Sequence, residues 1–165
     1  MAALNRAWTT NDDWMTPKSA WEDIKDYIPK VELWEAFYGD GESGKYLTEL
    51  GFNTVHENID FFENDRGAAV VSNPAFTLIP QVLERLLELN KPFILIMPSS
   101  KINTQYFRNL FAKQDDPIQI IIPKKRIQFM KMVNGVVDPK QKKACAFDCF
   151  YYCWKIGLSR DITWL

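Results

Sequence analysis

The chain has 165 residues, 47% of them hydrophobic and 25% charged, a composition typical of a globular protein with one domain and a substantial core. Its formal net charge of −1 excludes a chain that is basic throughout, so a polyanion would have to be bound by local basic clusters. No apolar run is long enough to span a membrane and the N-terminus does not resemble a signal peptide, so we expect an intracellular protein without a membrane partner.

The first half of the chain alternates between helix and strand. Residues 1–16 show no clear periodicity, and a helix is then predicted from Thr16, a possible cap before Pro17, as far as Ile28. The segments that follow are predicted as strands over 31–37, 52–57 and 68–72 and as a helix that closes at Gly51.

The second half becomes rich in strands. A strongly amphipathic helix is predicted over 79–89, an all-apolar strand over 93–97, a helix over 102–113, and strands over 118–122, 126–132, 145–154 and within 156–165. This order predicts an α/β fold with a doubly wound, mostly parallel sheet and antiparallel strands at its C-terminal edge.

The cysteines and the histidine limit the chemistry available. Cys145, Cys149 and Cys153 lie among aromatic residues in one segment, and we interpret them as small buried hydrophobic residues in a reducing compartment. His56 is the only histidine, so neither a histidine-based zinc site nor a Ser-His-Asp arrangement can be assembled. We expect no metal.

The strand predicted to end at Ser72 runs into Asn73, Pro74 and, two residues later, Phe76. Proline cannot continue a central strand, so Asn73 is expected at the edge of the sheet. The Asn73 amide oxygen and the Pro74 carbonyl can accept hydrogen bonds from a planar amine, while Phe76 offers an apolar face to the ring that carries it.

A glycine turn upstream, Phe37 to Gly41, admits two interpretations. Gly39 to Lys45 fits a phosphate-loop pattern, although Tyr46 stands where that pattern requires Ser or Thr to hold magnesium. In the second interpretation Glu35 accepts from a cationic amino group, and the glycines let a ligand approach the backbone. We favour the second, because Glu35 would repel a triphosphate.

Three further residues suit the rest of such a ligand. Glu57, at the end of the second predicted strand, is placed to bind two ribose hydroxyls. Asp60 and Phe61 suit the amine and the face of an adenine. A ligand with an ammonium group, a ribose and an adenine is S-adenosylmethionine, which we therefore expect as the cofactor.

These motifs together resemble a known family. The chain is similar to small Rossmann-type N6-adenine DNA methyltransferases of phages and large DNA viruses: Asn73-Pro74-Ala75-Phe76 matches their Asn-Pro-Pro-Phe/Tyr signature, and Phe37 to Gly41 their Phe-x-Gly-x-Gly. Residues 14–17 match a Trp-x-Thr-Pro element that closes over the cofactor. The resemblance covers nearly the whole chain, with looser matches at 97–100 and 126–129.

The resemblance implies a three-layer Rossmann-like S-adenosylmethionine-dependent methyltransferase fold, in a single domain over 1–165 without a separate target-recognition domain. It implies methyl transfer to the N6 amine of adenine in DNA, and a viral protein working in the host cytoplasm or a viral factory. With the residues above, the expected cofactor-binding set is Trp14, Thr16, Pro17, Glu35, Phe37, Gly39, Asp40, Gly41, Glu57, Asp60, Phe61 and Asn73. The expected catalytic set is Asn73, Pro74, Ala75 and Phe76.

One residue departs from the family pattern. Ala75 stands at the second proline, and since the acceptors come from Asn73 and Pro74 we expect reduced or normal turnover. A catalytically silent partner subunit that binds cofactor or nucleic acid stays an alternative. An RNA adenine-N6 or a cytosine-N4 methyltransferase is another, because each substrate presents an amine on a flat ring.

A basic C-terminal span is expected to hold the nucleic-acid backbone. DNA is the expected partner and RNA the alternative, and flanking apolar C-terminal segments favour a homodimer. The residues expected to contact phosphates are Lys124, Lys125, Arg126, Lys140, Lys142 and Lys143.

Overall fold

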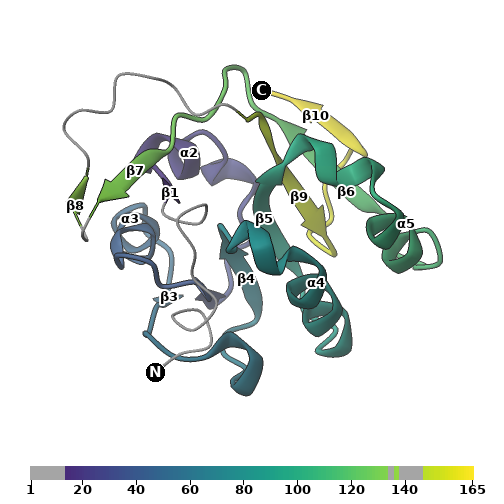
Figure 1. The fold of residues 1–165 in the computed structure, drawn as a ribbon, viewed down its shortest axis with the longest axis horizontal. Helices are drawn as coiled ribbons and strands as arrows, with labels where there is room; N and C mark the ends of the chain where they lie inside the picture. Colours follow the sequence, from purple (N-terminus) through teal and green to yellow (C-terminus); the bar gives the residue numbers. More distant parts are fainter. Residues whose placement is uncertain (1–13, 134–135, 138–146) are drawn as a thin grey trace.

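The computed structural model describes residues 14–133, 136–137 and 147–165 of the chain. One sheet contains β2 (Leu33–Trp34), β3 (Thr54–Val55), β4 (Ala69–Ser72), β5 (Phe93–Pro98), β6 (Ile118–Ile122), β9 (Cys149–Trp154) and β10 (Ile162–Trp164). Its seven strands follow the order β10-β6-β9-β5-β4-β2-β3 (Figure 1). A second sheet, in the order β1-β7-β8, contains β1 (Trp14–Met15), β7 (Met130–Val133) and β8 (Val136–Val137).

The large sheet is mostly parallel. Its strand pairs are parallel except for the two that β9 forms, with β5 and with β6. The predicted α/β fold with a mostly parallel sheet is therefore confirmed, but the antiparallel strand does not lie at the edge as expected.

The burial of the last two strands explains this difference. Tyr151, Tyr152 and Cys153 in β9 are fully buried, whereas Ile162 and Trp164 in β10 are 51% and 75% exposed. A strand covered on both faces suits the interior of a sheet. β10, which runs parallel to β6, forms the edge instead.

Helices cover both faces of the sheet and make three layers. On one face lie α4 (Ile79–Glu88) and α5 (Gln105–Phe111), and on the other α2 (Lys18–Glu22) and α3 (Glu42–Glu49), each pair in its own hydrophobic cluster. Val70 belongs to the first cluster and Val71 to the second, as the alternation of side chains along a strand requires. Short 3-10 helices are η2 (Lys25–Tyr27), η3 (Phe61–Glu63), η4 (Phe76–Leu78) and η5 (Ser99–Asn103).

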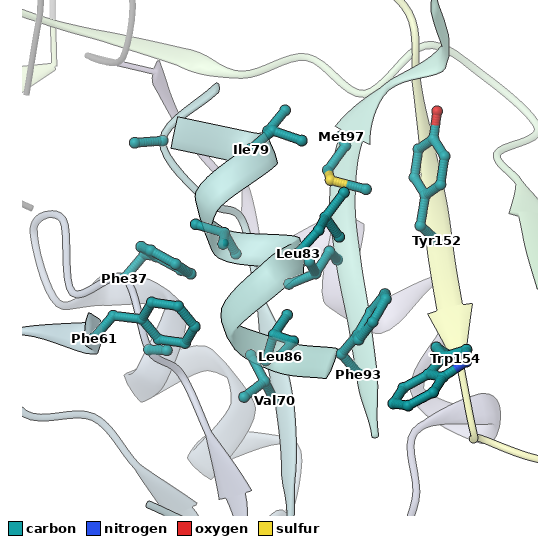
Figure 2. Packing of buried hydrophobic residues seen from close by; sticks show 14 of the residues in the cluster. Phe37, Phe61, Val70, Ile79, Leu83, Leu86, Phe93, Met97, Tyr152 and Trp154 are labelled. Atoms are coloured by element: carbon teal, nitrogen blue, oxygen red, sulfur yellow. The ribbon is translucent and has the colours of Figure 1, made fainter. Parts of the chain in front are cut away.

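Helix α4 fixes the middle of the sheet. Figure 2 shows its Leu83 and Leu86 directed at the side chains of β4 and β5, including Val70 and Phe93. All four side chains are fully buried, and each such aliphatic or aromatic side chain contributes roughly 1.5–3 kcal/mol of hydrophobic stabilisation. This packing holds β4 in place, and with it the residues that directly follow β4.

Several predicted elements are shorter in the structure. The strand over 31–37 is reduced to β2, because the Phe37 amide donates to a Glu35 side-chain oxygen (3.0 Å) instead of a neighbouring strand. The first helix is split into α2 and η2, and the helix over 102–113 into η5 and α5. The strand over 126–132 contributes β7, which pairs with β1. Within the described residues, no helix is long and apolar enough to cross a membrane.

Candidate functional site

A pocket lies at the carboxyl ends of β2 and β4. The chain adds β3 on one side of β2 and then β4 on the other, and such a reversal leaves a crevice at the carboxyl ends of parallel strands. The cavity, of only about 20 Å³, is lined by Trp14, Met15, Thr16, Glu35, Phe37, Tyr38, Gly39, Asp40, Ser43 and Asn73. The structure thus brings together residues of the predicted cofactor set from β1, β2, β4 and the glycine turn.

Asn73 lines this pocket directly after β4. Its Oδ1 atom is buried and has no hydrogen-bond partner among the described residues. A buried amide oxygen without a partner costs roughly 1–3 kcal/mol, so such an atom at a pocket wall is typical of a ligand-binding acceptor. Pro74 and Ala75 beside it are buried, and Phe76 is partly exposed.

Glu35 is the buried acid of the pocket. The residue is only 1% exposed. Its Oε1 accepts hydrogen bonds from the Phe37 amide (3.0 Å) and from the Ser72 hydroxyl. The pKa of the Glu35 carboxyl is raised to about 8, mainly by burial and also by nearby Asp40, while the two hydrogen bonds act in the opposite direction. At neutral pH the carboxyl is therefore mostly protonated until a cation binds beside it.

The glycine turn leads from the pocket into α3. Gly39 and Gly41 have φ angles of 56° and 83°, a region that favours glycine. A Cβ on Gly39 would lie 3.1 Å from the sulfur of Met15, so this glycine allows β1 to lie close over the turn. Lys45, the lysine of the phosphate-loop pattern, is exposed, pairs with Glu42 at 2.8 Å and does not line the pocket.

Gly44, in α3, has a packing role that was not predicted from the sequence. The His56 and Tyr38 rings stack with their centroids 6.4 Å apart, and a Cβ on Gly44 would lie 2.2 Å from His56 Cγ. Gly44 therefore makes room for the histidine that follows β3. The contact joins positions with no common periodicity, so no sequence pattern indicated it.

Five predicted cofactor residues lie outside the pocket lining, and three of them, Glu57, Asp60 and Phe61, come after β3. Glu57 is exposed and lies 3.6 Å from Arg66. Asp60 is buried and accepts from the Phe62 amide at 2.8 Å, which caps η3. Phe61 is 1% exposed, with its ring 4.9 Å from that of Phe37. Phe61 therefore supports Phe37 from the core side.

Pro17 and Gly41 are the other two predicted cofactor residues outside the pocket lining, and each directly follows a residue that lines the pocket. Thr16 is 4% exposed and lines it. Pro17, at the N-terminus of α2, accepts from the Ala20 amide at 3.1 Å. Gly41 precedes α3 and donates to the Tyr38 carbonyl at 2.7 Å.

An aromatic cluster beside the pocket joins four segments. Phe76 meets Phe147 edge-on with centroids 5.4 Å apart, and Phe129 at 6.4 Å. Trp14 contacts Phe147 in the same way at 5.8 Å, and Lys131 Nζ lies 5.0 Å from the Trp14 ring. Phe76 and Trp14 were predicted as site residues from the sequence, whereas Phe129 and Phe147 were not. These two residues are distant from Phe76 in the sequence and come close to it only in the folded chain.

The predicted basic residues are only partly within the described chain. Lys124 and Lys125 are exposed in the connection between β6 and β7, and Arg126 pairs with Asp148 at 2.8 Å. Lys140, Lys142 and Lys143 lie outside the described residues, as does Cys145. Cys149 and Cys153 are buried, which confirms the interpretation of these two cysteines as hydrophobic residues.

The chain was compared with protein-family models, with curated proteins and with solved structures, and none of the three comparisons gave a match.

Proposed function

We propose that the protein transfers a methyl group from S-adenosylmethionine to the N6 amine of adenine in DNA. The observation that carries this proposal is the buried Asn73 Oδ1, which has no hydrogen-bond partner within the described part of the chain and shares a pocket with the buried acid Glu35. In such a reaction Asn73 would bind the amine that receives the methyl group, and Glu35 would bind the ammonium group of the methyl donor. The strand order, with its reversal at β2, suits the corresponding Rossmann-like methyltransferase fold.

The pocket residues fit the methionine end of this cofactor. Glu35 would accept from the ammonium group, and the backbone at Gly39 permits close approach. When bound, the cofactor supplies an already activated methyl group, so the protein has mainly to position the two reactants. The cavity of about 20 Å³ is far smaller than the ~300–1,000 Å³ of typical ligand sites. The proposal therefore requires the pocket to widen when the cofactor binds, and Trp14 and Met15 of β1, which lies close over the glycine turn, form the wall that we expect to move outward.

Asn73 and Pro74 would hold the target amine. Its lone pair is delocalised into the purine ring, and two acceptors that bind its two hydrogens favour a more pyramidal nitrogen. The lone pair then points at the methyl group. A base in a duplex must be flipped out to reach these acceptors, and Phe76, with Phe129 and Phe147 beside it, offers aromatic surface for the flipped ring.

The best-supported second candidate is a silent cofactor-binding subunit, and the observation that favours it is Ala75 in place of proline. The same acceptor geometry would also serve adenine in RNA or the N4 amine of cytosine. The phosphate-loop alternative is weakened by the position of Lys45.

Thermal shift and label transfer test the proposal together. We expect S-adenosylhomocysteine to raise the melting temperature and ATP with magnesium to leave it unchanged. With labelled S-adenosylmethionine and a mixture of DNA and RNA, label should enter DNA. Stabilisation by ATP alone would instead support a nucleotide-binding protein, and bound cofactor without label transfer would support the silent subunit.

Restoring proline at position 75 should not lower activity. Ala75 has a φ angle of −58°, within the range that the proline ring imposes. Ala75→Pro should therefore raise the melting temperature by about 1–4 °C, because proline reduces the conformational entropy of the unfolded chain. The cofactor affinity should be unchanged. A sharp rise from no transfer to measurable transfer would identify the natural protein as the silent subunit.

The exposed pair Lys124 and Lys125 should contribute to DNA affinity. Replacing both with alanine should reduce the steepness of log K against log[salt] by about one to two, since each phosphate contact contributes about 0.9 to the slope. The matched control is Lys25→Ala with Lys30→Ala, two exposed lysines that precede β2 at the opposite end of the strands. An equal change in both variants would place the DNA elsewhere.

A further inference from the structure

We propose that Glu35 gives up a proton to solvent when the ammonium group of the cofactor binds, so that cofactor affinity depends on pH between pH 6 and 8. This inference rests on the proposed function and concerns how the same pocket selects its ligand. In the balanced step the protonated Glu35 carboxyl loses its hydrogen as H⁺, and the resulting carboxylate forms an ion pair with the ammonium group.

The geometry shows why Glu35 holds a proton in the free protein. The residue is 1% exposed, and both of its hydrogen bonds from the described residues fall on Oε1, from the Phe37 amide and the Ser72 hydroxyl. Oε2 accepts none from the described chain. A carboxylate in this position has lost its solvent without gaining a cation, which is unfavourable.

The surrounding charges act in the same direction. From the glycine turn, Asp40 lines the pocket and acts together with burial, the larger cause, in raising the pKa of Glu35 to about 8. Tyr38 is the other titratable residue of the lining. The remaining lining residues from β1, α3 and the end of β4 are uncharged, and none of the described lining residues carries a positive charge. An ammonium group would therefore be the first cation beside this acid.

Calorimetry measures the released proton. Titrating the protein with S-adenosylhomocysteine at pH 7 in buffers of different ionisation enthalpy should show release of about 0.9 proton per site, since a group of pKa about 8 is about nine-tenths protonated there. The apparent affinity should rise about tenfold from pH 6 to pH 7 and about fivefold from pH 7 to pH 8. 5′-Methylthioadenosine lacks the ammonium group and should bind without releasing a proton.

Two variants locate the proton. Glu35→Gln keeps the side-chain shape and cannot ionise, so its S-adenosylhomocysteine affinity should be weaker and flat with pH. Ser72→Ala removes a hydrogen bond that lowers the pKa of Glu35, so its affinity profile should move to higher pH. His56→Gln, a change outside the pocket lining, should show the same dependence of affinity on pH as the natural protein.

A second measurement does not need the ligand. The folded protein keeps the Glu35 proton up to about pH 8, whereas the unfolded chain releases it near the ordinary glutamate pKa of about 4.3. Stability contributed by this proton is present at low pH and is lost as the pH rises toward 8. Glu35→Gln should therefore gain melting temperature relative to the natural protein between pH 5 and 8.

The outcomes separate this inference from the proposed function. S-Adenosylhomocysteine binding with no proton release and a flat pH profile would overturn the inference and leave the proposed function standing. Absence of binding at every pH would overturn both. Release that persists in Glu35→Gln would assign the proton to another group and would also overturn it.

Discussion

Asn73→Ala should lower methyl transfer by about 10²–10³-fold, the effect expected when one preorganised polar group is removed from an active site. The reason is that Asn73 Oδ1 is an acceptor of the pocket to which none of the described residues donates, and without it one hydrogen of the target amine has no partner. Cofactor affinity should be nearly unchanged, because Glu35 and the glycine turn remain. The measurement is label transfer to DNA, with S-adenosylhomocysteine affinity determined in parallel.

Asn73→Asp is the matched control, since it retains a side-chain oxygen at the same place and should keep more activity than Asn73→Ala. Folding should not be impaired in Asn73→Ala, because the substitution removes a buried oxygen that has no partner among the described residues. Equal activity of Asn73→Ala and the natural protein would show that Asn73 does not hold the amine.

Gly44→Ala should destabilise the fold by about 3 kcal/mol, the upper part of the range for overpacking, and lower the melting temperature by about 6–12 °C. A Cβ at position 44 would lie 2.2 Å from His56 Cγ and 2.4 Å from His56 Cβ. Rotation of the ring cannot relieve the second contact, so α3 or β3 must shift. Thermal or urea unfolding measures the loss.

The double variant Gly44→Ala with His56→Gly identifies the cause. Without the His56 side chain the new methyl group has room, and alanine is better than glycine inside a helix by up to about 1 kcal/mol. The methyl group should then be neutral or stabilising in the His56→Gly background. Lys45→Ala, at an exposed position of α3, should leave the melting temperature nearly unchanged. A large loss in the double variant would contradict this explanation.

The two residues at the centre of the candidate site, Asn73 and Glu35, could be predicted from the sequence around each of them. Asn73 follows a run of buried strand residues and Glu35 follows another, so parallel pairing of β2 with β4 is enough to bring them to one pocket. The layers were predictable for the same reason, because the strongly amphipathic segment that forms α4 must cover one face of a sheet.

The remaining differences come from non-local contacts. The ordering of β9 between β5 and β6 depends on which strand is buried on both sides, and periodicity alone does not specify strand order. Phe61 was interpreted as an adenine-facing ring, yet its contacts with Trp34 and Phe37 place it in the core. Phe147, just before β9, contacts Phe76 although the two residues are far apart in the sequence, so the sequence alone did not indicate this contact.

Mass spectrometry of nucleosides tests the central claim most directly. The protein would be incubated with methyl-deuterated S-adenosylmethionine and a mixture of unmethylated DNA and RNA, and the nucleosides analysed after complete digestion. The account predicts deuterated N6-methyldeoxyadenosine, formed about 10²–10³-fold more slowly when Asn73→Ala replaces the natural protein. Bound cofactor without any labelled nucleoside, or label confined to cytosine or to RNA, would contradict it.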